Sequence, residues 1–255
     1  MRVNNLIALA AIATAVSSLL AGRAQAGPPY VTDDPEPVPY QHFEFYNLSL
    51  GTAIRGDTQG EGPAWEYNYG IIPNGQAHII APLTFDTQAG SYGYGDTELG
   101  FKYRVVDEDK NDWRPMVGVY PLVELPTGNV DRGLGAGYVR AYFPLWIQKS
   151  FGEWTTYGGG GYWINPGNDN KNWGYLGCVV QRKMTKTLTL GAEVFFETPR
   201  AAGGTSNTVL NVGGGYDLND TYHLIWSAGH TVQGASAFDY FLGLQITFGP
   251  KEESK

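Results

Sequence analysis

The stretch from Lys186 to Thr198, KTLTLGAEVFFET, alternates between two kinds of side chain. One set is wholly apolar and comprises Leu188, Leu190, Ala192, Val194 and Phe196. The intervening set is mostly small or polar and carries the carboxylate of Glu193 near its centre. A period of two predicts a β-strand whose two faces meet different surroundings. The stretch also has the length of about 9–11 tilted residues with which a strand crosses a bilayer.

The end of the chain repeats this pattern. From Phe238 to Phe248, one face carries Phe238, Tyr240, Leu242, Leu244, Ile246 and Phe248. The other face carries Asp239, Phe241, Gly243, Gln245 and Thr247. We therefore interpret the chain as copies of one amphipathic strand. The predicted fold is all-β, a transmembrane antiparallel up-and-down β-barrel of about 12 strands.

Strand-like segments recur from Gln41 onward. We expect them at residues 42–51, 64–72, 76–85, 93–106, 113–125, 137–149, 153–164, 172–184, 186–198, 207–217, 221–230 and 237–248. Tight turns are expected at 73–75, 151–152, 185–186 and 218–220, and longer loops at 52–63, 86–92, 126–136, 165–171, 199–206 and 231–236. Short turns at one end and long loops at the other are typical of outer-membrane barrels. The segment 107–112 is longer and charged, and it weakens this alternation at one point.

The first 26 residues read as a secretory signal peptide. Arg2 precedes an apolar run from Leu6 to Leu20, and Ala24-Gln25-Ala26 is a small-x-small cleavage signal. The apolar run is short for a membrane-spanning helix, and no later stretch is apolar enough to be one. We expect the protein in the bacterial outer membrane, and strands rather than helices would have to span that membrane.

Composition excludes several classes of partner. Only 16% of the residues are charged, against about 25% in a usual soluble domain. The net charge is −8, and without a basic cluster nucleic acid is not an expected partner. The single Cys178 excludes an internal disulfide, and the four histidines lie on separate segments. We expect no metal and no cofactor.

Residues 27–41, GPPYVTDDPEPVPYQ, are Pro-rich and acidic and cannot form a regular helix or central strand. The sequence favours an extended lead-in on the periplasmic side. The alternative is a plug that enters the barrel, where Asp33, Asp34 and Glu36 would meet cationic groups of the lumen.

Glycine and proline inside the strands predict irregularities. Mid-strand Pro82, Pro121 and Pro144 each remove a ladder donor, so we expect local bends there. The run from Gly158 to Gly161 leaves room for strong curvature or for a neighbour's side chain.

The polar phase of the strands predicts the lining of the lumen, because a charge facing hydrocarbon near the midplane costs about 2–4 kcal/mol. The candidates are Asp96, Glu98, Lys102, Arg104, Tyr120, Tyr138, Arg140, Tyr142, Trp146, Glu193, Phe195 and Asp239. Inward aromatic rings could stack on a flat apolar solute. The charged side chains would give the lumen an electrostatic potential with both positive and negative regions. The simpler alternative is that these side chains only pair with one another inside a closed lumen.

Several short motifs resemble one known family. They are Gly93-Tyr-Gly-Asp96, Glu124-Leu-Pro-Thr-Gly128, Gly133-Leu-Gly-Ala-Gly137, the TLGAEVFFET strand and a final strand that ends on Phe. Together they resemble the outer-membrane transporters grouped with the meta-pathway phenol-degradation proteins, over residues 27–248. The resemblance implies an outer-membrane barrel that passes small hydrophobic or aromatic compounds, and it supplies no catalytic residues. The tail 249–255, which follows the final Phe248, departs from the usual barrel end.

The expected function is passive uptake of a small solute through an outer-membrane channel without enzyme activity. Outer-membrane lipid and, during biogenesis, the barrel assembly machinery are the expected partners. The first alternative is an outer-membrane barrel hydrolase that uses His223 with Ser227, or His230, although neither comes with a recognisable motif. The second is a structural or adhesive barrel that transports nothing.

Overall fold

A computed structural model describes residues 28–109 and 111–250, so the predicted signal peptide and the end of the C-terminal tail lie outside the described residues. The strands are β1 (Phe43–Ile54), β2 (Asp57–Ile72), β3 (Gly75–Asp86), β4 (Ser91–Tyr94), β5 (Thr97–Val106), β6 (Met116–Val119), β7 (Leu122–Leu125), β8 (Arg140–Phe151), β9 (Trp154–Ile164), β10 (Trp173–Lys183), β11 (Leu188–Glu197), β12 (Asn207–Asp217), β13 (Tyr222–Gln233) and β14 (Phe238–Phe248). A 3-10 turn, η1 (Val130–Arg132), lies in the loop before β8. Within the described ranges, no helix is both long and apolar enough to cross a bilayer.

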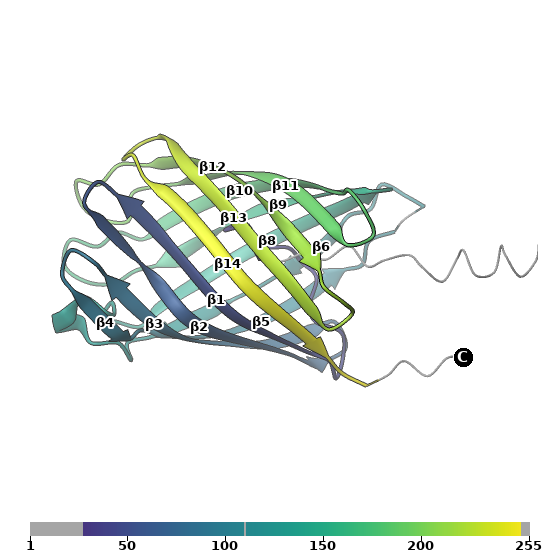
Figure 1. Cartoon of the computed structure of the whole chain (residues 1–255), viewed down its shortest axis with the longest axis horizontal. Coiled ribbons are helices and arrows are strands. Elements are labelled where there is room, and N and C mark those ends of the chain that lie inside the picture. The colour runs from purple at the N-terminus through teal and green to yellow at the C-terminus, as the bar shows by residue number, and fades with distance from the viewer. Residues whose placement is uncertain (1–27, 110, 251–255) are drawn as a thin grey trace, which may run out of the picture.

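The sheet closes on itself, because β1 pairs with β14 on one side and with β2 on the other (Figure 1). All pairings between named strands are antiparallel. Strands β4 and β5 both pair with β3, and β6 and β7 both pair with β8, so each of these couples is one interrupted strand. The fourteen segments therefore form twelve barrel strands. The predicted closed, antiparallel 12-strand barrel is confirmed, and each predicted segment overlaps one of its strands.

The first predicted loop, residues 52–63, is wrong. Strands β1 and β2 continue through it, pairing up to Ile54 with Asp57, and the chain turns at Arg55 and Gly56. The φ of Gly56 is +86°, a conformation that glycine adopts at no steric cost. Gly62 and Pro63 lie where β2 shifts register against both neighbours, so these residues mark a bulge rather than a loop.

The three mid-strand prolines lie at two irregular places. Pro121 separates β6 from β7, and Pro144 faces this gap because β8 pairs with β6 up to Leu145 and with β7 from Tyr142. Pro82 pairs with Ala64, at the register shift of β2. The expected irregularity is present at Pro82 and Pro121. Pro144 keeps regular pairing with Gly161 of β9, so the expectation is wrong on that side.

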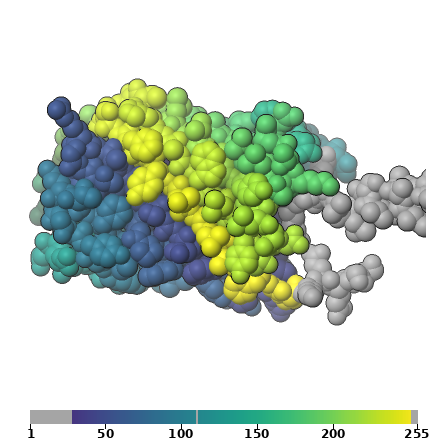
Figure 2. Space-filling model, viewed as in Figure 1, coloured from purple at the N-terminus to yellow at the C-terminus, as the bar shows by residue number. Residues whose placement is uncertain are grey.

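The two faces of the strands differ as the alternation predicts. In β11, Val194 is 44% exposed on the outside, whereas Glu193 and Phe195 are buried inside. The outer surface carries most of the exposed large apolar side chains, and Figure 2 shows it as a continuous wall in which the N-terminal strands abut the C-terminal ones. Both ends of the described chain lie at the same end of the barrel as the short turns (Figure 1).

Candidate functional site

The Pro-rich N-terminal segment, residues 28–42, enters the barrel. Thr32 and Asp34 have no exposed surface. The Thr32 backbone N–H donates to Glu193 Oε1 at 2.6 Å, and Ser227 Oγ donates to the Pro29 carbonyl at 2.6 Å. The favoured prediction of a lead-in outside the barrel is therefore wrong. Proline-rich backbone has few N–H donors to satisfy, and the lumen side chains satisfy several of those that remain.

Two further contacts hold this segment. Lys102 Nζ on β5 lies 3.0 Å from Asp33 Oδ1 and 4.0 Å from Asp34 Oδ1. The Val38 N–H donates to Gln76 Oε1 on β3 at 2.8 Å. Lys102 is only 5% exposed, so its charge is compensated by this segment inside the barrel.

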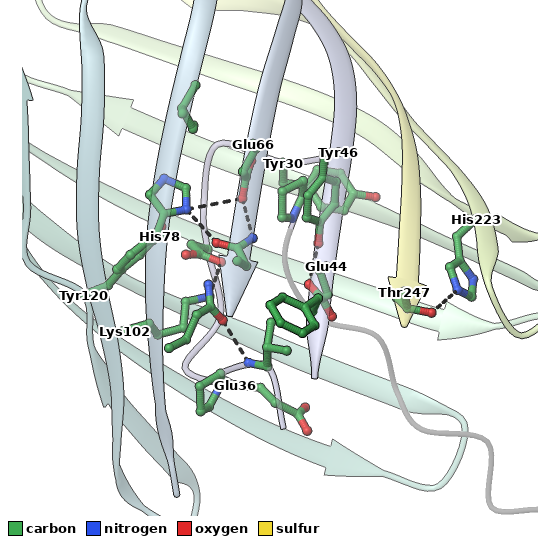
Figure 3. A pocket seen from close by; sticks show the side chains of 18 of the residues that line it. Tyr30, Glu36, Glu44, Tyr46, Glu66, His78, Lys102, Tyr120, His223 and Thr247 are labelled. Atoms are coloured by element: carbon green, nitrogen blue, oxygen red, sulfur yellow. Dashed lines mark hydrogen bonds and ion pairs between the residues drawn. The ribbon is translucent and has the colours of Figure 1, made fainter. Parts of the chain in front are cut away.

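A cavity of about 1650 Å³ remains beside the segment (Figure 3). Its lining reaches from Asp220 and Thr221, in the turn before β13, to Trp173 and Arg200, at the opposite end of the barrel. The lumen is thus partly filled by the N-terminal segment, and the remaining space extends along the barrel.

An aromatic wall covers one side of the cavity. It consists of Tyr142 and Trp146 on β8, Trp163 on β9, Trp173 and Tyr175 on β10, and Phe195 on β11. Neighbouring ring centroids lie 4.8 to 6.0 Å apart, the spacing of stacked and tilted aromatic pairs.

The glycine run of β9 makes room for this wall. A Cβ at Gly161 would lie 2.3 Å from the Tyr142 ring, and one at Gly159 would lie 3.0 Å from the Trp146 ring. The expectation that Gly158 to Gly161 leave space for a neighbour's side chain is confirmed. The rings of Tyr142 and Trp146 therefore lie close to the β9 backbone, in space that a side chain would otherwise occupy.

An acidic wall, defined here as Glu44, Glu66 and Glu98 with His78, lies on β1, β2, β5 and β3. His78 Nε2 lies 3.0 Å from Glu98 Oε1, and His78 Nδ1 lies 3.5 Å from Glu66 Oε1. In the order of twelve strands, β2 is diametrically opposite β10. The acidic wall therefore faces the aromatic wall across the lumen.

Seven of the twelve predicted lumen residues line the cavity: Glu98, Lys102, Tyr120, Arg140, Tyr142, Trp146 and Phe195. Glu193 is buried and holds the N-terminal segment instead. Arg104 donates to Asn74 Oδ1 at 2.5 Å, in the turn between β2 and β3.

The remaining three predicted residues lie toward the loop end of the barrel. Asp96 accepts hydrogen bonds from the backbone of Gly128 and Ala136 at 2.9 and 2.6 Å. Asp239 accepts from Thr52 Oγ1 at 2.6 Å. Tyr138 precedes β8 and is 45% exposed, so its place on a lumen-facing strand is wrong. Strand β8 starts at Arg140, two residues later.

Sequence reasoning missed much of the cavity lining. Glu44, Glu66 and His78 lie on the first three strands, and Trp163, Trp173 and Tyr175 lie on β9 and β10, and no lumen-facing set was predicted for any of these five strands. The same period of two would have placed each of them. Strand β2 was harder, because its bulge reverses the phase between Glu61 and Ala64.

The residues considered for catalysis have other partners. Ser227 Oγ donates to Pro29, whereas His223 Nδ1 lies 2.8 Å from Asp217 Oδ1 and its Nε2 lies 3.3 Å from Thr247 Oγ1. His230 Nδ1 lies 2.7 Å from the Thr231 carbonyl. In residues 28–109 and 111–250, no group of three or more His, Cys, Asp or Glu side chains is arranged to hold a metal.

Solved structures of outer-membrane channels share this fold. The COG4313 outer membrane channel from Pseudomonas putida F1 aligns with a TM-score of 0.69 at 13% identity, covering 88% of this chain and 100% of that one. The KdgM porin in complex with disordered oligogalacturonate aligns at 0.56 with 10% identity, covering 81% and 99%. The NanC porin aligns at 0.56 with 7% identity, covering 80% and 98%. No protein-family model matches the sequence, and no curated protein matches it.

Proposed function

We propose that this chain is a bacterial outer-membrane channel for passive uptake of small apolar or aromatic solutes. The observation that carries the proposal is the aromatic wall, which lines a continuous cavity inside a closed barrel. Aromatic side chains that only filled a core would leave no such space. The fold it shares with solved channels and porins supports a channel role.

The size of the cavity fits this proposal. A volume of about 1650 Å³ exceeds the roughly 300–1,000 Å³ typical of small-molecule pockets. The N-terminal segment divides the cross-section, so a bulky hydrated solute would meet more obstruction than a flat one. A flat apolar solute can exchange water for ring faces such as those of Trp163 and Tyr142, which are stacked 4.8 Å apart.

The outer surface of the barrel supports the proposed place in the outer membrane. Apolar side chains such as Leu176, Val194 and Leu242 stand outward at 64%, 44% and 54% exposure. Such a surface suits outer-membrane lipid, and its insertion would require the barrel assembly machinery. Membership in the phenol-degradation transporter group stays a prediction from the sequence resemblance.

Liposome swelling tests the proposal. Purified mature protein is reconstituted, and uptake of phenyl glucoside is compared with that of a disaccharide of similar mass. We expect faster uptake of the aromatic solute, and we expect Trp163→Leu to reduce that preference. The matched control is Trp65→Leu, because Trp65 is 40% exposed on the outer face. Equal rates for the two solutes would indicate a general pore, and no swelling with either would indicate a barrel without transport.

A further inference from the structure

The cavity lining carries more negative than positive charge. It includes eight carboxylates and five Lys or Arg side chains. Three of those cations are already compensated, because Lys102 pairs with Asp33, Arg140 with Glu124 and Arg200 with Glu197. The lumen therefore has an electronegative interior before any solute enters.

The excess charge is concentrated on the acidic wall. Within the described part of the chain, none of Glu44, Glu66 and Glu98 has a Lys or Arg nitrogen within 4.0 Å. A single imidazole, that of His78, lies between Glu66 and Glu98. Even a protonated His78 would compensate only one of the three carboxylates.

Glu66 presents an unused acceptor to the cavity. Its side chain is only 9% exposed, and its Oε1 accepts from Asn68 Nδ2 at 2.7 Å. Among the described residues, the hydrogen bond and the ion pair of Glu66 both use Oε1 and leave Oε2 without a donor, and Glu66 points into the cavity in Figure 3. A carboxylate oxygen that opens on a cavity of low dielectric constant is free to pair with a cation or with a donor from a ligand.

We propose that this lumen binds organic cations, in which a positively charged nitrogen is attached to an aromatic or other apolar group. This inference rests on the proposed function and specifies its solute class. The ammonium would lie toward Glu66 and the apolar part against the aromatic wall, whose ring faces also attract cations. The negative potential of a narrow, low-dielectric passage raises the local concentration of cations and lowers that of anions.

The arginines that border the aromatic wall do not offer an equivalent site for anions. Arg200 stacks 4.2 Å from the Trp173 ring centroid and donates to Glu197 Oε2 at 2.6 Å. Arg140 lies 5.9 Å from the Trp163 centroid and is bonded to Glu124. An anionic solute would have to displace one of these carboxylates, whereas a cation meets Glu66 directly.

Binding to the detergent-purified mature protein tests the inference. The probes are benzyltrimethylammonium and benzenesulfonate, two aromatic ions of fixed and opposite charge, followed by quenching of tryptophan fluorescence. We expect the ammonium to bind at least about tenfold more tightly, in line with a desolvated cation–π contact and a facing carboxylate. Glu66→Gln should remove most of this difference. The control Glu153→Gln, at an exposed position in the turn between β8 and β9, should leave it unchanged.

Equal or tighter binding of benzenesulfonate would overturn the inference, and so would ammonium binding that Glu66→Gln leaves intact. If Glu66→Gln fails to fold, as judged by heat-modifiable gel migration, Glu98→Gln provides the second variant with the same expected loss. The swelling assay, repeated with the same two aromatic ions as solutes, separates the two proposals. Ammonium binding without any solute uptake would contradict only the channel function, and uptake with a preference for the anion would contradict only the cation site.

Discussion

Lys102 Nζ and Asp33 Oδ1 lie 3.0 Å apart and join barrel strand β5 to the N-terminal segment inside the lumen. The pair is buried, with side-chain exposures of 6% and 19%. Asp34, which is fully buried, has its Oδ1 4.0 Å from the same ammonium. One lysine thus lies within ion-pair distance of two carboxylates of a segment that has no regular secondary structure of its own.

Replacing Lys102 should loosen the segment. Lys102→Met leaves Asp33 and Asp34 buried without their cation, and breaking a buried pair in this way costs about 3–5 kcal/mol. We expect faster cleavage after Tyr30 by chymotrypsin, measured on the folded protein, because Tyr30 is buried while the segment stays in the lumen. The control is Lys171→Met in the exposed loop after β9. Identical cleavage rates for Lys102→Met and the wild-type protein would show that the ion pair does not hold the segment.

Deleting residues 28–39 should widen the passage. The barrel strands start at Phe43 and close without this segment, so the variant should still migrate as a heat-modifiable folded barrel. Single-channel conductance in planar bilayers should rise, because the segment occupies part of the lumen cross-section. An unchanged conductance in a correctly folded variant would mean that the constriction lies elsewhere.

Asp96 should control the order of the long loop before β8. It accepts hydrogen bonds from Gly128 and Ala136, so Asp96→Ala leaves two backbone donors without their acceptor, at about 1–3 kcal/mol. We expect trypsin to cut at Arg132 more readily in proteoliposomes. Glu153→Ala is the control, since Glu153 is exposed in the turn between β8 and β9 and lies far along the chain from Arg132. Equal cleavage in both variants would contradict the bracing role of Asp96.

A charge on the outer face of β11 should be costly. Val194→Arg places a guanidinium where we expect hydrocarbon, which near the bilayer midplane costs about 2–4 kcal/mol. The free energy of unfolding, measured by urea titration in lipid vesicles, should fall by that amount, whereas Val194→Leu should change it little. A loss below about 0.5 kcal/mol for Val194→Arg would contradict the lipid-facing assignment.

The strands and their faces were predictable because alternation is a local property. In β11, Glu193 and Val194 already differ in character along the sequence, and a strand sends consecutive side chains to opposite faces. Glycine and proline were less reliable as indicators of where a strand ends. Gly62 and Pro63 indicated a loop, yet they lie in a bulge that the neighbouring ladders tolerate.

The sequence by itself determined that this chain would form a closed barrel of amphipathic strands with a polar and aromatic interior, because a period of two depends only on adjacent residues. The tertiary structure alone decided where the N-terminal segment lies and which walls face each other. Thr32 and Glu193 are 161 positions apart, and no local pattern specifies that their backbone and side chain meet. That contact exists because closing the barrel brings buried donors and acceptors into one lumen, where each must find a partner.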